Sequence, residues 1–223
     1  MKFGWPEYDI RADFSPRQPL VLSVEHPTAL GELIQDWQKQ VSGEGGGLYV
    51  WDGERDFALS KRAELILNPF VLEMNSKKVL NQIHRELTES ALTEFYEETA
   101  ALRGRLARYW ERLLAACPYD LVYEVDVDMG KLLKTCGIRV DDGEGDFFIK
   151  IDDYVKALHR ICGVDLFVFL NLKQFVPAEK LAVLYQSAAY EQVSLILLEG
   201  VYRGKLETEN NLILDQDCCM IQV

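Results

Sequence analysis

LFVFLNLKQFVPAEKLAVLYQSAAYEQVSLILLEG, residues 166–200, decides the fold class of this protein. Its two ends, 166–171 and 195–199, are short apolar runs typical of strands that are buried on both faces. Between them, Pro177 marks the first turn of a helix. A strand, a helix of about a dozen residues and a second strand predict a parallel, right-handed βαβ unit. The chain is therefore expected to contain an α/β layer.

The same kind of pattern occurs near the start of the sequence. LVLSV at 20–24 predicts a strand, and apolar residues recur at helical spacing within 28–40. The layer is expected to continue with strands at LYVWD (48–52), ELILN (64–68) and within the final ILDQDCCMIQV (213–223). GEGGG at 43–47 is expected to be a hairpin turn.

A long helical segment separates these two halves. Residues 75–117 contain no Pro and one Gly, apolar side chains return every three to five residues, and Pro118 follows. This pattern predicts one helix of about forty residues, roughly 60 Å long, that projects from the domain. Shorter helices are expected at 129–136 and 151–162. We expect a discontinuous α/β head domain at 1–68 and 150–223, interrupted by a helical leg domain at 69–149.

Length and composition restrict the class of protein. With 223 residues, 48% of them apolar, the chain can form a globular core and is unlike a disordered tail. The first residues, MKFGWPEYDIRADF, contain no apolar run that would direct export or cross a bilayer, so a cytoplasmic location is expected. The five cysteines form no CxxC pair, and we expect reduced, buried structural thiols.

Charge is distributed unevenly along the chain. The formal net charge of −12 at first argues against a nucleic-acid partner. However, residues 61–117 carry nine Lys or Arg and eight Glu, a balance of +1, whereas the rest carries 15 basic and 28 acidic residues, a balance of −13. Candidate phosphate contacts in this segment are Lys77, Lys78, Arg85, Arg105, Arg108 and Arg112. The last three share one helical face. The alternative is a solvated face balanced by Glu94, Glu97, Glu98 and Glu111.

The sequence lacks the usual signatures of catalysis. A phosphate-binding Walker A loop needs GxxxxGK[ST] between a strand and a helix, whereas GEGGG precedes a predicted strand and no Lys-Ser or Lys-Thr follows it. The strand at 166–171 ends in Asn171, where a Walker B strand carries an acid. His26, His84 and His159 accompany no nucleophile motif, and packed or surface positions are expected. We therefore expect no enzymatic activity. A nucleotide hydrolase descended from P-loop enzymes, and an acidic interaction subunit that never touches DNA, are the rival hypotheses.

The stretch PYDLVYEVDVDMG, residues 118–130, allows two interpretations. Alternating apolar residues are typical of an edge strand. Its carboxylates are Asp120, Glu124, Asp126 and Asp128. They repel one another unless water, salt or a divalent cation such as calcium screens them. The spacing is not that of an EF-hand, because the sixth and twelfth positions from Glu124 are Met129 and Thr135.

Several segments, taken in order, resemble the CRISPR-associated accessory protein of subtype II-A adaptation modules, the Csn-two family. The stretch at 166–200 is similar to the family's apolar strand ending in Asn, its helix, and its strand ending in Leu-Glu. ELILNPFVLEMNSKKVLNQIHREL at 64–87 resembles the family's strand, turn and Asn-Ser entry into a long helix. KLLKTCGIRV at 131–140 and NLILDQDCCMIQV at 211–223 resemble the helix after the projection and the C-terminal ending.

The resemblance implies a degenerate, non-hydrolysing P-loop-like parallel-sheet head with an inserted long-helix leg domain. It also implies a homotetrameric ring that threads or caps the ends of double-stranded DNA during CRISPR spacer acquisition, a step of antiviral defence. The implied partners are the CRISPR integrase complex and the RNA-guided nuclease, with no membrane.

Calcium is the cofactor that the resemblance implies, bound by acids that follow the long helix. Asp120 and Glu124 match acids of the family's loop, whereas Val122 and Val125 replace two others. Asp126 and Asp128 are the candidates to replace the missing carboxylates.

Overall fold

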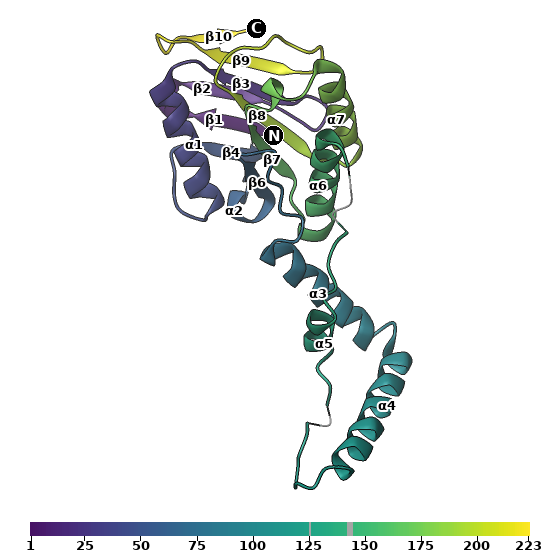
Figure 1. Ribbon diagram of the computed structural model, residues 1–223. Helices are drawn as coiled ribbons and strands as arrows, with labels where there is room; N and C mark the ends of the chain where they lie inside the picture. Colours follow the sequence, from purple (N-terminus) through teal and green to yellow (C-terminus); the bar gives the residue numbers. More distant parts are fainter. Residues whose placement is uncertain (125, 142–144) are drawn as a thin grey trace. The chain divides into compact units, whose positions relative to one another are not determined.

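The computed structural model describes residues 1–124, 126–141 and 145–223, and the chain divides into two compact units (Figure 1). Unit 1 consists of Met1–Met74 and Gly143–Val223 and contains both β-sheets. Unit 2, Asn75–Asp142, is helical in its described part. The α/β class predicted from the sequence is confirmed.

A six-stranded sheet forms the centre of unit 1. Its strands are β3 (Leu20–Val24), β6 (Ala63–Ile66), β7 (Leu166–Leu170), β8 (Ser194–Glu199), β9 (Asn210–Leu214) and β10 (Met220–Gln222). The order is β10-β9-β3-β8-β7-β6, and every neighbouring pair is parallel except β9 and β10. All residues of β3 and β8 are buried, as expected for parallel strands that are covered on both faces.

The predicted βαβ unit is confirmed. β7 pairs in parallel with β8, from Leu166 opposite Ser194 to Leu170 opposite Leu198, and α7 (Ala178–Tyr190) connects them. Pro177 is the N-cap of α7, one position before the first turn.

Helices cover the two faces of this sheet. α1 (Pro27–Val41) lies on one side, and α6 (Phe147–Cys162) and α7 lie on the other (Figure 1). α6 begins earlier than predicted because the Asp146 side chain accepts hydrogen bonds from the amides of Phe148 and Ile149. A short helix, α2 (Leu59–Arg62), precedes β6.

A second, antiparallel sheet contains β1 (Lys2–Trp5), β2 (Ile10–Asp13), β4 (Tyr49–Asp52) and β5 (Arg55–Asp56), in the order β2-β1-β4-β5. The prediction that 48–52 belongs to the parallel layer is wrong, because β4 pairs with β1, a strand that the sequence pattern did not predict. GEGGG joins α1 to β4 and is not a hairpin turn. The C-terminal stretch contributes to two strands, β9 and β10, instead of one.

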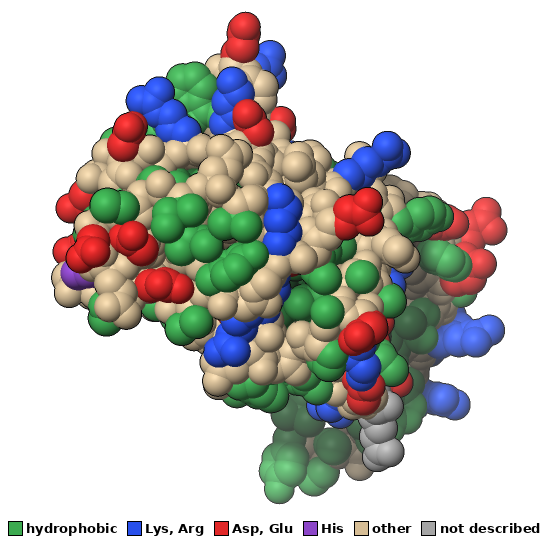
Figure 2. Space-filling view, turned by 90° about the horizontal axis from the view of Figure 1, so that it is seen from above, with side chains coloured by type: hydrophobic (Ala, Val, Ile, Leu, Met, Phe, Trp, Pro, Cys, Tyr) green, Lys and Arg blue, Asp and Glu red, His purple; other side chains and the backbone are tan. Residues whose placement is uncertain are grey.

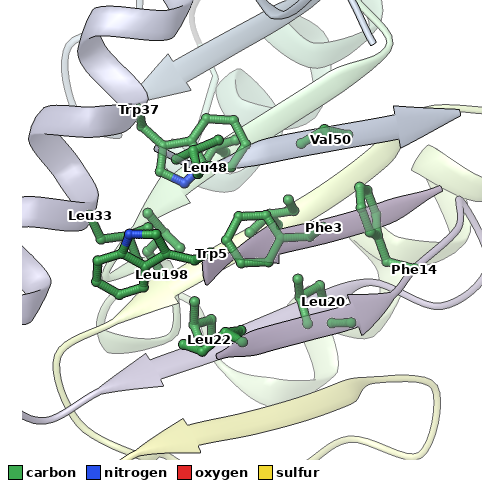
Figure 3. Packing of buried hydrophobic residues seen from close by; sticks show 14 of the residues in the cluster. Phe3, Trp5, Phe14, Leu20, Leu22, Leu33, Trp37, Leu48, Val50 and Leu198 are labelled. Carbon is green, nitrogen blue, oxygen red and sulfur yellow. The ribbon is translucent and has the colours of Figure 1, made fainter. Parts of the chain in front are cut away.

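The core packs between the two sheets and α1 (Figure 3). Phe3 and Trp5 of β1 point into it, where the Phe3 ring stacks on Trp37 of α1 with the centroids 6.0 Å apart. Leu22 of β3 and Leu198 of β8 close it from the larger sheet. Burial of these large apolar side chains is the main stabilising contribution to unit 1.

Unit 2 contains α3 (Lys77–Leu92), α4 (Tyr96–Ala115) and α5 (Met129–Thr135). The prediction of one helix over 75–117 is wrong, since the chain turns at 93–95 and the two helices follow different axes (Figure 1). The Thr93 hydroxyl donates a hydrogen bond to the Glu89 carbonyl at 2.8 Å, and the Phe95 amide donates one to the Ser90 carbonyl. These contacts replace the regular helical ladder and end α3.

The five cysteines, all of them described, form no disulfide. The prediction of buried thiols is wrong, because three are exposed and two are half-buried. No helix in the described ranges combines the length and apolarity needed to cross a bilayer.

Candidate nucleic-acid interface

Three arginines on α4 form the basic face predicted from the sequence. Arg105, Arg108 and Arg112 are exposed and, with Glu111, line one hollow on the helix surface. Their spacing of three and four residues places them on one side of the helix. α4 carries Glu97 and Glu98 in its first turn and Arg112 in its last turn, which is the distribution of charge that stabilises the helix dipole.

These three guanidinium groups are available to an anion. Within residues 1–124, 126–141 and 145–223, none of the three has a carboxylate within ion-pair distance. Arg103, on the same helix, differs because its guanidinium pairs with Asp126 at 3.1 Å. Arg108 Nη1 packs close to Gly104, 3.7 Å from the point that a Cβ on Gly104 would occupy. We call Arg105, Arg108 and Arg112 the arginine face.

The other three predicted phosphate contacts, Lys77, Lys78 and Arg85, lie on α3. None of them lines the hollow of the arginine face. Lys77 and Lys78 are exposed in the first turn of α3, which Ser76 caps by accepting a hydrogen bond from the Val79 amide. Arg85 is exposed and lines a different hollow, beside Lys134 of α5 and Glu89.

The acidic stretch 118–130 is not a strand in its described part, so the edge-strand interpretation is wrong. A strand needs a hydrogen-bonded neighbour, and the described part of unit 2 offers none. Val122, one of the apolar residues that would face the core in such a strand, is 97% exposed. Val125, which belongs to the same pattern, lies outside the described residues.

The four carboxylates of this stretch have different surroundings. Asp120 and Glu124 are exposed. Asp126 pairs with Arg103, and Asp128 caps α5 by accepting from the Lys131 amide at 3.0 Å, a hydrogen bond that lowers the pKa of Asp128. No group of three His, Cys, Asp or Glu side chains in the described residues is arranged to hold a metal ion. Two of the four acids are thus engaged elsewhere, and the set does not fit a calcium site in this conformation.

Each of the three histidines makes a hydrogen bond with a backbone group. His26 Nδ1 accepts from the Ala29 amide and caps α1, while His84 Nε2 lies 3.0 Å from the Ile138 carbonyl. His159 Nδ1 lies 2.9 Å from the Val164 carbonyl. These contacts bear out the expectation that the histidines are packed or surface residues.

A buried polar cluster that joins Lys173, Tyr185 of α7 and Glu209, the residue before β9, was not predicted. Lys173 Nζ binds the Glu209 carboxylate at 2.9 Å, and the Tyr185 hydroxyl donates to the same group at 2.7 Å. Burial raises the pKa of Glu209, but hydrogen bonds from Asn211, the Leu206 amide, Lys173 and Tyr185 outweigh it and lower the pKa overall. The cluster fixes the segment between β8 and β9 against α7 and the short helix η2 (Leu172–Gln174).

Glu199 lies beside this cluster at the end of β8. Its side chain is fully buried, and Oε1 accepts from the Lys173 amide at 2.9 Å. Oε2 has no hydrogen-bond partner among the described residues and lies 3.8 Å from Arg203 Nε. Burial raises the pKa of Glu199 to about 7. The sequence signal for this site is an acid that ends an apolar strand, as Glu199 does in LILLE.

The family model of the CRISPR-associated protein Cas_Csn2 matches residues 40–218, which is most of the chain and includes every candidate site residue. The chain belongs to the Cas_Csn2 family. The resemblance drawn from the sequence is thereby confirmed, and a CRISPR-associated role follows from Cas_Csn2 membership. A search of curated proteins finds no match.

Proposed function

We propose that this Cas_Csn2 protein is a non-enzymatic binder of double-stranded DNA ends that acts in CRISPR spacer acquisition. The arginine face is the observation that carries the proposal, because three exposed guanidinium groups without acidic partners in the described residues can hold successive phosphates. Contacts with phosphates carry affinity without reading bases, so binding is independent of sequence.

The surface charge of the protein agrees with a localised site. Acidic and basic side chains are interspersed on the face shown in Figure 2, and no broad area of one sign covers it. With a net charge of −12, a phosphate backbone is repelled except where basic groups are concentrated. The arginine face is such a place.

Assembly into a homotetrameric ring is the second part of the proposal. α4 buries only Thr99, while Leu102, Tyr109 and Leu113 are each more than two-fifths exposed. An apolar stripe of this kind is stable in water when another protein surface covers it. A second copy of the chain supplies that surface, and several copies multiply the phosphate contacts.

The head is proposed to be P-loop-like without hydrolysing nucleotides. β3 leads directly into α1, the strand-to-helix connection at which a P-loop holds phosphates. Glu25 and His26 occupy this connection in place of GxxxxGK[ST]. Asn171 directly follows β7, a strand that β8 separates from β3. The CRISPR integrase complex and the RNA-guided nuclease are the proposed protein partners. Calcium binding by residues 118–130 stays a prediction, because Asp126 and Asp128 make other contacts.

Retention of different DNA forms tests the proposal. The protein should retain linear duplex and release covalently closed circles of the same sequence, with affinity that falls steeply as salt rises. Equal retention of both forms would exclude binding through ends. Absence of a shift at low salt would exclude DNA binding and favour an interaction subunit.

A further inference from the structure

The outward face of the small antiparallel sheet carries exposed aromatic rings. Side chains alternate across a strand, so Phe3, Trp5 and Val50 point into the core while their neighbours point outward. The register places Gly4 beside Tyr49, and Lys2 beside Trp51. Two aromatic side chains at positions i and i+2 of β4 therefore share the outward face.

The two rings are held over a hollow in this face. The Tyr49 and Trp51 ring centroids are 6.1 Å apart with an interplanar angle of 60°, and Trp51 is 45% exposed. The Tyr49 ring lies across the backbone of β1 because Gly4 has no side chain; a Cβ there would come within 2.0 Å of Tyr49 Cζ. The hollow is lined by both rings together with Lys2, Arg11 and Asp13. We call these five residues the aromatic face.

The charged groups of the aromatic face suit a nucleotide. Lys2 is exposed at one side of it, and the Arg11 guanidinium contacts only Asp9 among the described acids, at 3.9 Å between two highly exposed side chains. Such a pair is weak and gives way to a better anion. Asp13 is also exposed, and a carboxylate accepts hydrogen bonds from the exocyclic amino group of cytosine.

We propose that the aromatic face binds an unpaired nucleotide of a DNA strand. Trp51 and Tyr49 stack on the base, Lys2 and Arg11 contact the adjoining phosphates, and Asp13 accepts from a base amino group. Exposed rings between cations are the recurring way in which proteins hold single strands. Base faces are covered inside a duplex, so this site takes nucleotides at frayed or overhanging ends. The proposal rests on the proposed function for the identity of the polymer, but it uses none of the residues of the arginine face.

Tryptophan fluorescence tests the proposal in the full-length chain carrying Trp110→Phe. Trp5 and Trp37 are buried, so Trp51 is then the one exposed tryptophan. A short single-stranded oligodeoxycytidine should quench its emission at low salt, and oligodeoxythymidine should bind more weakly. In a matched assay with a labelled strand, Trp51→Ala should weaken binding about 5- to 150-fold, the factor expected for losing one stacked base. Gly4→Ala, which keeps both rings but displaces Tyr49, should weaken it as well. Asp13→Ala should remove the preference for cytidine.

Two comparisons separate this proposal from the proposed function. Replacing the three residues of the arginine face with Gln should leave single-strand binding unchanged while lowering affinity for blunt duplex, and Trp51→Ala should do the reverse. If Trp51→Ala and Gly4→Ala bind the single strand as tightly as the parent does, the proposal is overturned. A proline-rich peptide that quenches Trp51 when oligonucleotides do not would also overturn it. Self-association that is lost in Trp51→Ala, without an effect of DNA, would assign the face to a second copy and overturn it too.

Discussion

Removal of the arginine face should reduce both the affinity for DNA and its dependence on salt. The perturbation is Arg105→Gln, Arg108→Gln and Arg112→Gln together, which removes three positive charges per copy while leaving long polar side chains. Each phosphate contact contributes about −0.9 to the slope of log K against log salt concentration. Loss of three contacts should therefore make the slope about 3 less steep per engaged copy and weaken binding about 10²- to 10³-fold near 0.1 M salt. The fold should survive, because the three side chains are exposed and have no acidic partner in the described chain.

Titration of a labelled blunt duplex at several salt concentrations measures this slope. Arg103→Gln is the matched control, since it removes the same charge from the same helix but from a guanidinium that already pairs with Asp126. The control should keep nearly the parent slope. Circular dichroism and light scattering should show unchanged helix content and oligomeric state for both variants. A triple variant with the parent slope would show that the arginine face is a solvated surface and that phosphates are contacted elsewhere.

Three further predictions concern stability. Burial raises the pKa of Glu199 from its ordinary value of 4.5 to about 7. The stability that this residue contributes at low pH is therefore lost as pH rises from about 4.5 to 7, by at most about 3 kcal/mol. Urea unfolding of Glu199→Gln should lack this loss, and parallel pH profiles of variant and parent would contradict the burial argument. Lys173→Met should cost about 3–5 kcal/mol because it leaves the Glu209 carboxylate buried without its cation, and adding Glu209→Gln should recover part of that cost. The calcium prediction is tested by thermal melts with chelator and with millimolar calcium: a calcium-dependent rise that Asp120→Asn with Glu124→Gln abolishes would support it, whereas coincident melts of the parent protein would rule it out.

Local patterns in the sequence were sufficient to predict several elements. β7, α7 and β8 were predicted correctly because two apolar runs flank a helix that follows Pro177, and strands of this composition are stable when helices cover both faces of the sheet. The arginine face was also predictable, since helical spacing alone places Arg105, Arg108 and Arg112 on one side. These features depend on neighbours within a few turns of the chain.

Contacts between distant residues decided the rest. LYVWD has the composition of any strand, and its place in the small sheet was set by pairing with β1, more than forty residues earlier in the chain. The aromatic face exists only because that pairing puts Gly4 beneath Tyr49. Likewise, the sequence pattern indicates Asp126 as a cation ligand, but the fold places its Oδ1 3.1 Å from Arg103 Nη1. Sequence periodicity thus determined the strongly patterned elements, such as β7, α7 and β8. Sheet partners, ion pairs and burial were decided by the tertiary structure, because their energies depend on contacts between groups that are far apart in the sequence.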